Sequence, residues 1–228
     1  MSSFIPFCRP AIGDEEIEAV TAVLRSGWIT TGPQNQALEA LCCEMLGCQH
    51  AVAVCSATAG MHVTLMALDI GPGDEVITPS QTWVSTVNLI TLLGATPVFV
   101  DVDIPTYNID AALIEAAVTD KTKAIMVAHT LGNPFNLAEV RRIADKYNLW
   151  LIEDCCDALG TKYDGKMVGT FGDIGTVSFY PAHHITMGEG GAVFTDSPLL
   201  KRIVESFRDW GRDCYCAPGC DNTCGKRF

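Results

Sequence analysis

Short apolar segments rich in β-branched residues alternate along the chain with segments whose apolar residues recur every three or four positions. The first pattern is typical of buried strands, and the second is typical of amphipathic helices. Strands are therefore expected over residues 51–55, 75–79, 96–102, 123–129, 149–154, 175–179 and 191–195. Helices are expected over residues 14–25, 34–46, 58–68, 84–93, 109–117 and 137–147.

The order of these elements predicts the fold class. Strands and helices alternate through most of the chain, which favours a mainly parallel sheet with helices on both faces. We expect an α/β protein with a three-layer α/β/α arrangement around about seven strands. The pattern changes after residue 208, because residues 209–228 are rich in Cys, Gly and Asp and have no clear period. The chain then ends four residues after a Cys and looks cut short.

Composition narrows the class of protein. The 228 residues are 48% hydrophobic and 18% charged, as in a globular chain with a sizeable core. A net charge of −12 argues against a general nucleic-acid binder and against a binder of anionic membranes. No apolar run reaches the roughly 18 residues of a membrane helix, and the N-terminus lacks the pattern of a secretory signal. We predict a cytoplasmic protein, in which eleven Cys indicate metal or redox chemistry rather than disulfides.

Two segments that follow predicted strands could bind a ligand. Residues 55–61 place small and hydroxyl side chains at a helix start, where free N–H groups can bind an anion. A simple N-cap by Ser56 or Thr58 explains the same pattern. Trp83 follows the strand over 75–79, where its ring could stack on a flat ligand or lie in the core.

Two later segments carry titratable side chains. Three carboxylates and two Cys lie at the end of the buried strand over 149–154, which is hard to explain by packing because unpaired buried charge is unfavourable. Asp154 could pair with a protonated heterocyclic nitrogen, serve as an N-cap or form a salt bridge. His183 and His184 lie in a loop before a glycine-rich turn. They could bind a metal, although no carboxylate lies at ligand spacing.

These four segments, in this order, resemble the DegT/DnrJ/EryC1/StrS family of sugar aminotransferases, whose large domain has the fold-type-I fold of enzymes that bind pyridoxal phosphate. The resemblance covers nearly the whole chain and includes residues 5–7, 27–33, 71–76 and 188–193. It implies a large domain with its N-terminal segment over 1–208 and a Cys-rich segment that binds a cluster over 209–228. It also implies that the family's C-terminal small domain is absent.

The resemblance implies a role for each residue of the cofactor site. The backbone at Thr58 and Ala59 and the hydroxyl of Ser178 would hold the cofactor phosphate. Trp83 would stack on the pyridine ring. Asp154 would pair with the protonated ring nitrogen and strengthen the ring as an electron sink.

His183 departs from the family pattern, because the family's Schiff-base Lys is expected at this position. No Lys lies between Lys166 and Lys201. An imidazole cannot tether the cofactor covalently, but it can move a proton at neutral pH. The loop therefore resembles that of the 3-dehydratases of nucleotide-linked 4-keto-6-deoxy sugars, which use pyridoxamine phosphate (PMP). A decayed aminotransferase is the alternative.

The Cys spacing resembles one group of these dehydratases. Fifty-seven residues separate Cys156 from Cys214, one separates Cys214 from Cys216, and seven separate Cys216 from Cys224. The resemblance implies a [2Fe–2S] cluster on these four thiolates, which suits one-electron steps. A tetrahedral zinc site on Cys214, Cys216, Cys220 and Cys224 is the alternative. We expect five further cysteines to be small buried hydrophobic residues, without a role in a metal site: Cys8, Cys42, Cys43, Cys48 and Cys55.

The resemblance thus implies a homodimeric enzyme that removes the C3 hydroxyl of CDP-4-keto-6-deoxy-D-glucose, with His183 as the base. A separate NADH-dependent flavin/iron–sulfur reductase would supply the electrons. Three alternatives stay open at this point: a sugar aminotransferase, a dehydratase without a cluster, and a zinc-binding fragment without activity.

Overall fold

The computed structural model describes residues 4–6, 8–214, 216, 220 and 223–226. Position 7, which carries part of the family resemblance, lies outside them. The strands are β1 (His50–Val54), β2 (Glu75–Pro79), β3 (Thr96–Val100), β4 (Thr122–Ala128), β5 (Trp150–Asp154), β6 (Lys162–Tyr163), β7 (Lys166–Met167), β8 (Ile174–Ser178) and β9 (Gly191–Thr195). The helices are α1 (Asp14–Ser26), α2 (Pro33–Leu46), α3 (Ala57–Ala67), α4 (Val84–Leu92), α5 (Ala111–Ala117), α6 (Leu137–Tyr147) and α7 (Pro198–Arg208), with a 3₁₀ helix η1 (Thr130–Gly132).

The described residues form one seven-stranded sheet with the order β1-β9-β8-β5-β4-β2-β3, and β6 and β7 form a separate hairpin. Strand β9 is antiparallel to both of its neighbours, whereas the neighbours from β8 to β3 pair in parallel. Six strands therefore run in one direction, β1 included, and their carboxyl ends lie at one edge of the sheet. In a sheet of this kind, ligands bind beyond the carboxyl ends of the strands.

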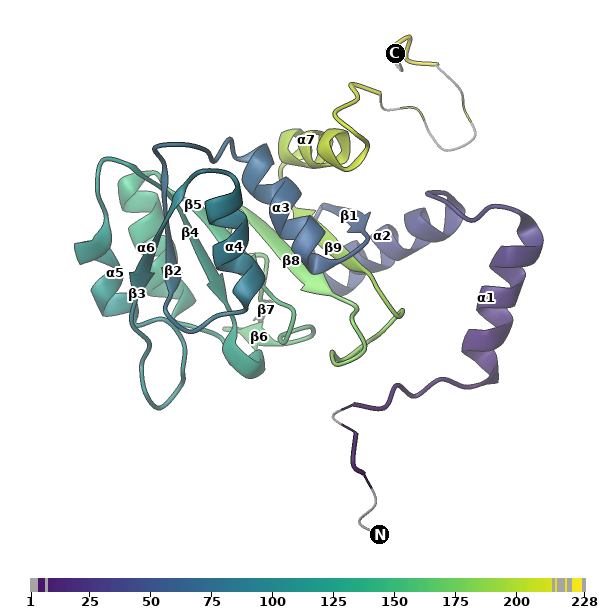
Figure 1. Cartoon of the computed structure of the whole chain (residues 1–228), viewed down its shortest axis with the longest axis horizontal. Helices are drawn as coiled ribbons and strands as arrows, with labels where there is room; N and C mark the ends of the chain where they lie inside the picture. Colours follow the sequence, from purple (N-terminus) through teal and green to yellow (C-terminus); the bar gives the residue numbers. More distant parts are fainter. Residues whose placement is uncertain (1–3, 7, 215, 217–219, 221–222, 227–228) are drawn as a thin grey trace.

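Helices cover both faces of the sheet and form two cores (Figure 1). Along β4, Ile125 and Val127 face the core with α2, α5 and α6, whereas Ala124 and Met126 face the core with α3, α4 and α7. The alternation follows from the two-residue period of a strand. Buried on both faces, such strands consist almost wholly of apolar residues. The predicted three-layer α/β/α architecture is confirmed.

All seven predicted strands and six predicted helices are present, with ends that shift by no more than two residues. Among the described elements, helix α7 is the one long helix that was not predicted. Its signals are present nonetheless: Ser197 caps the helix through the Leu200 N–H, Pro198 opens it, and Leu200 and Val204 lie buried one turn apart. Regular structure ends at Arg208, so the described residues from 209 onward contain no helix or strand.

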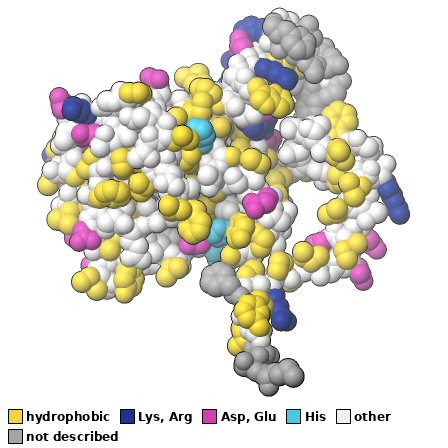
Figure 2. Space-filling model, in the orientation of Figure 1, with side chains coloured by type: hydrophobic (Ala, Val, Ile, Leu, Met, Phe, Trp, Pro, Cys, Tyr) yellow, Lys and Arg dark blue, Asp and Glu magenta, His cyan; other side chains and the backbone are white. Residues whose placement is uncertain are grey.

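Helix α1 differs from the other six helices because none of its residues is buried. It stands apart from the sheet in Figure 1, and apolar side chains lie along it in Figure 2. Ile17, Val20 and Leu24 belong to this exposed apolar face. Among the described residues, no helix is long and apolar enough to cross a bilayer.

Candidate active site

The first turn of α3 follows β1 at the carboxyl edge of the sheet. Ser56 caps the helix, and its Oγ accepts the Ala59 N–H at 3.1 Å, so the N-cap prediction is confirmed for Ser56. Thr58 is exposed at this turn and Ala59 is half-buried. Gly191 of β9 lies against the same turn, where a Cβ would come within 2.6 Å of the Ala57 nitrogen. This close approach makes a narrow cradle at the positive end of the helix dipole, which suits an anion.

Asp154 is the last residue of β5 and is only 5% exposed. Its Oδ1 accepts the Cys156 N–H at 3.0 Å. Desolvation raises the pKa of the carboxyl, and the nearby charge of Asp157 raises it further, although hydrogen bonds from Cys156 act in the opposite direction. Within the described part of the chain, no cationic side chain forms a salt bridge with Asp154, so that alternative is not observed. A buried carboxylate of this kind can stabilise a protonated ring nitrogen.

Ser178 ends β8, the strand beside β5, and also pairs with Gly191 of β9. Its Oγ accepts the Tyr180 N–H at 3.2 Å. Cys156 lies close to both Asp154 and Ser178, and burial beside the Asp154 carboxylate raises the pKa of its thiol far above the ordinary range. Asp154, Cys156 and Ser178 therefore line one place between the ends of β5 and β8.

Trp83 precedes α4 at the same edge, beyond the end of β2. Its side chain is 68% exposed, so the core alternative for this residue is wrong. An exposed indole at the ligand edge leaves a flat face free for stacking.

His183 lies in the loop after β8, where its backbone N–H donates to the Tyr180 carbonyl at 3.0 Å. Its Nδ1 lies 3.1 Å from Oδ1 of Asp157, in the turn after β5. No carboxylate at ligand spacing from the His pair was predicted, because the contact between Asp157 and His183 joins loops that are distant in sequence. We call Ser56–Ala59, Trp83, Asp154, Ser178 and the His183–Asp157 pair the sheet-edge site.

A buried network beneath this site was not predicted from the sequence. Glu153 is fully buried and accepts N–H groups of Gly169 at 2.7 Å, Phe171 at 2.8 Å and Gly172. It also lies 3.0 Å from Nε2 of His129, whose ring stacks on Phe135. Glu153 therefore has a structural role, because its four contacts fasten the loop over 169–172 and the end of β4 to β5.

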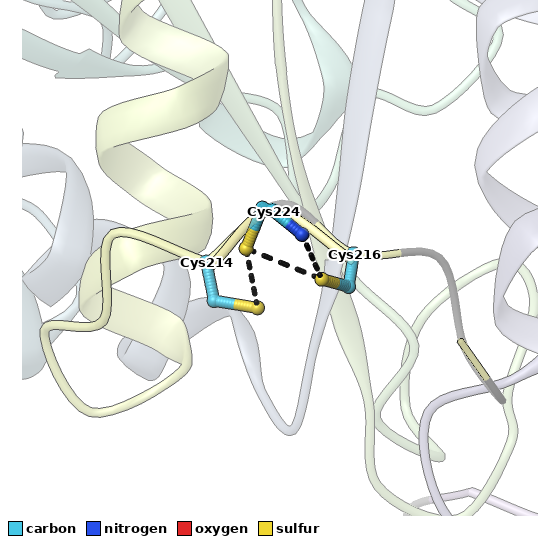
Figure 3. A group of neighbouring side chains, drawn as sticks. All are labelled: Cys214, Cys216 and Cys224. Atoms are coloured by element: carbon cyan, nitrogen blue, oxygen red, sulfur yellow. Dashed lines mark hydrogen bonds between the residues drawn. The ribbon is translucent and has the colours of Figure 1, made fainter. Parts of the chain in front are cut away.

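Three of the four predicted cluster ligands come together (Figure 3). The sulfur of Cys224 lies 3.2 Å from that of Cys216 and 3.6 Å from that of Cys214. Hydrogen bonds from the Thr223 hydroxyl and the Cys224 N–H lower the pKa of Cys216 to about 6. Among the described residues, neither Cys156 nor Cys220 joins this cysteine trio of Cys214, Cys216 and Cys224.

The five cysteines that were predicted to be buried differ in their exposure. Cys42 and Cys48 are buried as predicted, and burial raises the pKa of the first to about 11 and of the second to about 12. Cys8 and Cys43 are half-buried. Cys55 is exposed, so its predicted burial is wrong, because it comes directly after β1 at the open edge of the sheet.

Comparison with known proteins decides the family. A model described as the DegT/DnrJ/EryC1/StrS aminotransferase family matches residues 10–222. The chain belongs to this family. The match spans every residue of the sheet-edge site and two members of the cysteine trio.

Solved structures of an aminotransferase and of a sugar-nucleotide dehydratase share the fold. An aminotransferase from Psychrobacter cryohalolentis superposes with a TM-score of 0.88 at 38% identity, over 95% of this chain and 57% of its own. GDP-4-keto-6-deoxy-D-mannose-3-dehydratase of E. coli, determined with hydrated PLP, superposes with a TM-score of 0.84 at 34% identity. That match covers 89% of this chain and 54% of the dehydratase.

A curated relative is considerably closer in sequence. The lipopolysaccharide biosynthesis protein RfbH of Salmonella typhimurium is 63% identical over 235 aligned positions, which cover 100% of this chain. The chain spans about half (54%) of the length of RfbH.

Proposed function

We propose that this DegT-family protein removes the C3 hydroxyl of CDP-4-keto-6-deoxy-D-glucose in a PMP-dependent reaction, on the way to a 3,6-dideoxy sugar. The observation that carries the proposal is His183 in place of an amine at the sheet-edge site, on a segment that has no Lys between 166 and 201. The identity to RfbH, a lipopolysaccharide biosynthesis protein, and the likeness to a sugar-nucleotide 3-dehydratase support it.

The residues of the sheet-edge site fit a phosphopyridine cofactor. The cradle between Gly191 and the first turn of α3 suits the phosphate, with Thr58, Ala59 and Ser178 as its proposed contacts. Asp154 is buried and lacks a described cationic partner, so it suits the ring nitrogen. The exposed ring of Trp83 suits the flat face of the cofactor. When bound, PMP supplies an amine for the sugar ketone and a ring that withdraws electrons.

The chain's own contribution to the reaction is a proton transfer. The Nδ1 atom of His183 is engaged by Asp157, which leaves Nε2 to take a proton from the C4′ carbon of PMP. A neutral imidazole is a suitable base near pH 7. The electron pair that this proton transfer frees would expel the C3 hydroxyl, and the protonated His183 would return its proton so that the hydroxyl leaves as water.

Two measurements test this proposal against a sugar aminotransferase. Borohydride treatment with PLP should leave the wild-type chain without covalent cofactor at position 183, whereas His183→Lys should gain it. PMP-loaded protein given CDP-4-keto-6-deoxy-D-glucose and an electron donor should release a 3-deoxy sugar. Covalent PLP on the wild type, or an amino sugar as the product, would support the aminotransferase instead.

We further propose a [2Fe–2S] cluster on Cys156, Cys214, Cys216 and Cys224. Their spacing and the convergence of three sulfurs support it, and Cys156 has to join the trio for the fourth bond. Anaerobic reconstitution should give two irons and two sulfides per chain. Cys156→Ser should lose both, whereas the matched variant Cys220→Ser should retain them.

A second candidate is a dehydratase without an iron–sulfur cluster, in which Cys220 joins the cysteine trio to bind zinc. The observation that favours it is the position of Cys156, which lies beside Asp154 and Ser178 instead of the trio. Metal analysis that finds zinc without iron, together with zinc loss in Cys220→Ser, would support this candidate.

The proposed assembly is a homodimer that accepts electrons from a separate NADH-dependent flavin/iron–sulfur reductase. The exposed apolar face of α1 supports contact with a second subunit, and analytical ultracentrifugation should detect the dimer. The net charge of −12 supports docking to a basic reductase surface. Electron transfer should then become slower as ionic strength rises.

A further inference from the structure

The His183–Asp157 contact joins two loops that follow neighbouring strands. Asp157 lies just after β5, and His183 lies in the loop after β8, the strand paired with β5. The two side chains meet with Nδ1 and Oδ1 3.1 Å apart. The His183 side chain is 21% exposed, so one side of the ring is already covered, whereas Asp157 is 50% exposed.

Asp157 is held in place by the turn around it. The Ala158 N–H donates to the Cys155 carbonyl at 2.9 Å and closes this turn. Gly132 packs so closely that a Cβ there would come within 2.7 Å of the Asp157 carbonyl oxygen. The φ of Gly132 is +82°, a conformation that favours glycine, and its own carbonyl accepts the Thr161 hydroxyl at 3.2 Å. The backbone that carries Asp157 is therefore fixed by η1.

The loop that carries His183 is closed at both ends. The Phe179 carbonyl accepts the Met187 N–H at 3.0 Å and the Thr186 hydroxyl at 3.1 Å. Within this closed loop, the ring of Tyr180 meets the imidazole edge-on, with the ring centroids 6.4 Å apart. The imidazole is therefore restricted by the ring of Tyr180 and by the carboxylate of Asp157.

We propose that Asp157 is a positioning residue for His183, which accepts the Nδ1–H and so fixes the ring in the tautomer with a free lone pair on Nε2. A carboxylate can only accept a hydrogen bond, so the proton of a neutral ring must lie on Nδ1. Asp157 also stabilises the positive charge that His183 gains when Nε2 takes a proton. The catalytic meaning of this tautomer rests on the proposed function, but the tautomer itself does not.

The alternative is that Asp157 and His183 form a surface ion pair that does not change the tautomer of the imidazole. Exposed pairs often form and break without changing either partner. In that case the neutral imidazole would favour Nε2–H, as the free ring does in water, and replacing Asp157 would leave its tautomer unchanged. The two interpretations therefore differ in a property that needs neither cofactor nor substrate.

Long-range ¹H–¹⁵N NMR of the ¹⁵N-labelled chain decides between them. His183 is assigned from the spectrum of His183→Gln, and the pH is raised until the ring is neutral. We expect Nδ1–H in the wild type, a shift toward Nε2–H in Asp157→Asn, and no change in the matched exposed variant Asp120→Asn. Nε2–H in the wild type, or an unchanged ring in Asp157→Asn, overturns the proposal.

A kinetic test uses PMP-loaded protein and CDP-4-keto-6-deoxy-D-glucose in D₂O. Asp157→Asn should slow deuterium incorporation at C4′ of PMP by roughly 10²-fold, since the Asn amide favours the wrong tautomer, and should change PMP affinity little. An unchanged rate overturns the positioning role. If the wild type shows no incorporation, the proposed function fails, while the NMR result still decides the tautomer.

Discussion

The sheet-edge site and the cysteine trio are positioned by different means. Asp154 and Ser178 lie at the ends of strands whose hydrogen-bonded register fixes their distance from one another. The trio lies in a segment without described helices or strands, where sulfur contacts of 3.2 Å and 3.6 Å hold the residues together. The contrast indicates that the sheet-edge site is held by the hydrogen bonds of the sheet, whereas the cysteine trio is held by contacts within its own segment.

The largest expected effect concerns the network beneath the sheet-edge site. Glu153→Ala should lower the free energy of unfolding by about 3–5 kcal/mol, since it leaves buried His129, the buried Gly169 N–H and two half-buried backbone N–H groups without their partner. Urea unfolding followed by circular dichroism measures the change. The exposed variant Glu18→Ala should change it by no more than about 0.5 kcal/mol. A loss below about 1 kcal/mol for Glu153→Ala would contradict this role.

A smaller effect is expected on cofactor binding. Asp154→Ala should weaken PMP binding by about 10- to 100-fold, because a hydrogen bond to a charged group contributes about 1.5–3 kcal/mol. Equilibrium dialysis measures the affinity. Asp120→Asn should bind PMP like the wild type, and equal affinities for Asp154→Ala and wild type would disprove the assignment of Asp154.

The same carboxyl predicts a pH dependence of stability in the absence of cofactor. Burial raises the pKa of Asp154 in the folded state, so the neutral carboxyl is favoured there. The contribution of the neutral carboxyl to stability is present below the ordinary pKa of Asp and is lost as the pH rises through the folded pKa. Asp154→Asn keeps the acceptor for the Cys156 N–H and should therefore raise the melting temperature at pH 7. The gain should vanish below the ordinary Asp pKa of about 3.9. A gain that is equal at both pH values would contradict the argument.

The smallest effect is expected from the trio. Cys216→Ser should remove bound metal but change the free energy of unfolding of the sheet by less than about 0.5 kcal/mol, because the trio packs on neither core. Metal analysis and urea unfolding measure the two properties. A large loss of stability in the metal-free variant would show that the two regions are coupled and would break the comparison.

The strands were predictable because buried β-branched runs carry a strong local signal, and their order already placed Asp154, Ser178 and the start of α3 at one edge. The Asp157–His183 contact was not predictable from spacing, since it depends on how two loops meet in three dimensions. The role of Glu153 was equally hidden, because its partners are backbone groups. Helix α7 could have been found from Ser197, Pro198 and its apolar period.

The position of Cys156 shows the limit of sequence spacing. The 57 residues between Cys156 and Cys214 predict that Cys156 binds the same cluster as the trio, whereas in the structure Cys156 packs beside Asp154 and Ser178. Sequence spacing identifies which thiols could bind one metal centre. It does not determine whether their sulfur atoms lie close together in the folded chain.

The central claim is that His183 moves a proton and does not anchor the cofactor. Mass spectrometry of PMP recovered after incubation with CDP-4-keto-6-deoxy-D-glucose in D₂O tests it most directly. The account predicts deuterium at C4′ with the wild type and none with His183→Gln, at nearly equal PMP affinity. Deuterium incorporation by His183→Gln at the wild-type rate would contradict it.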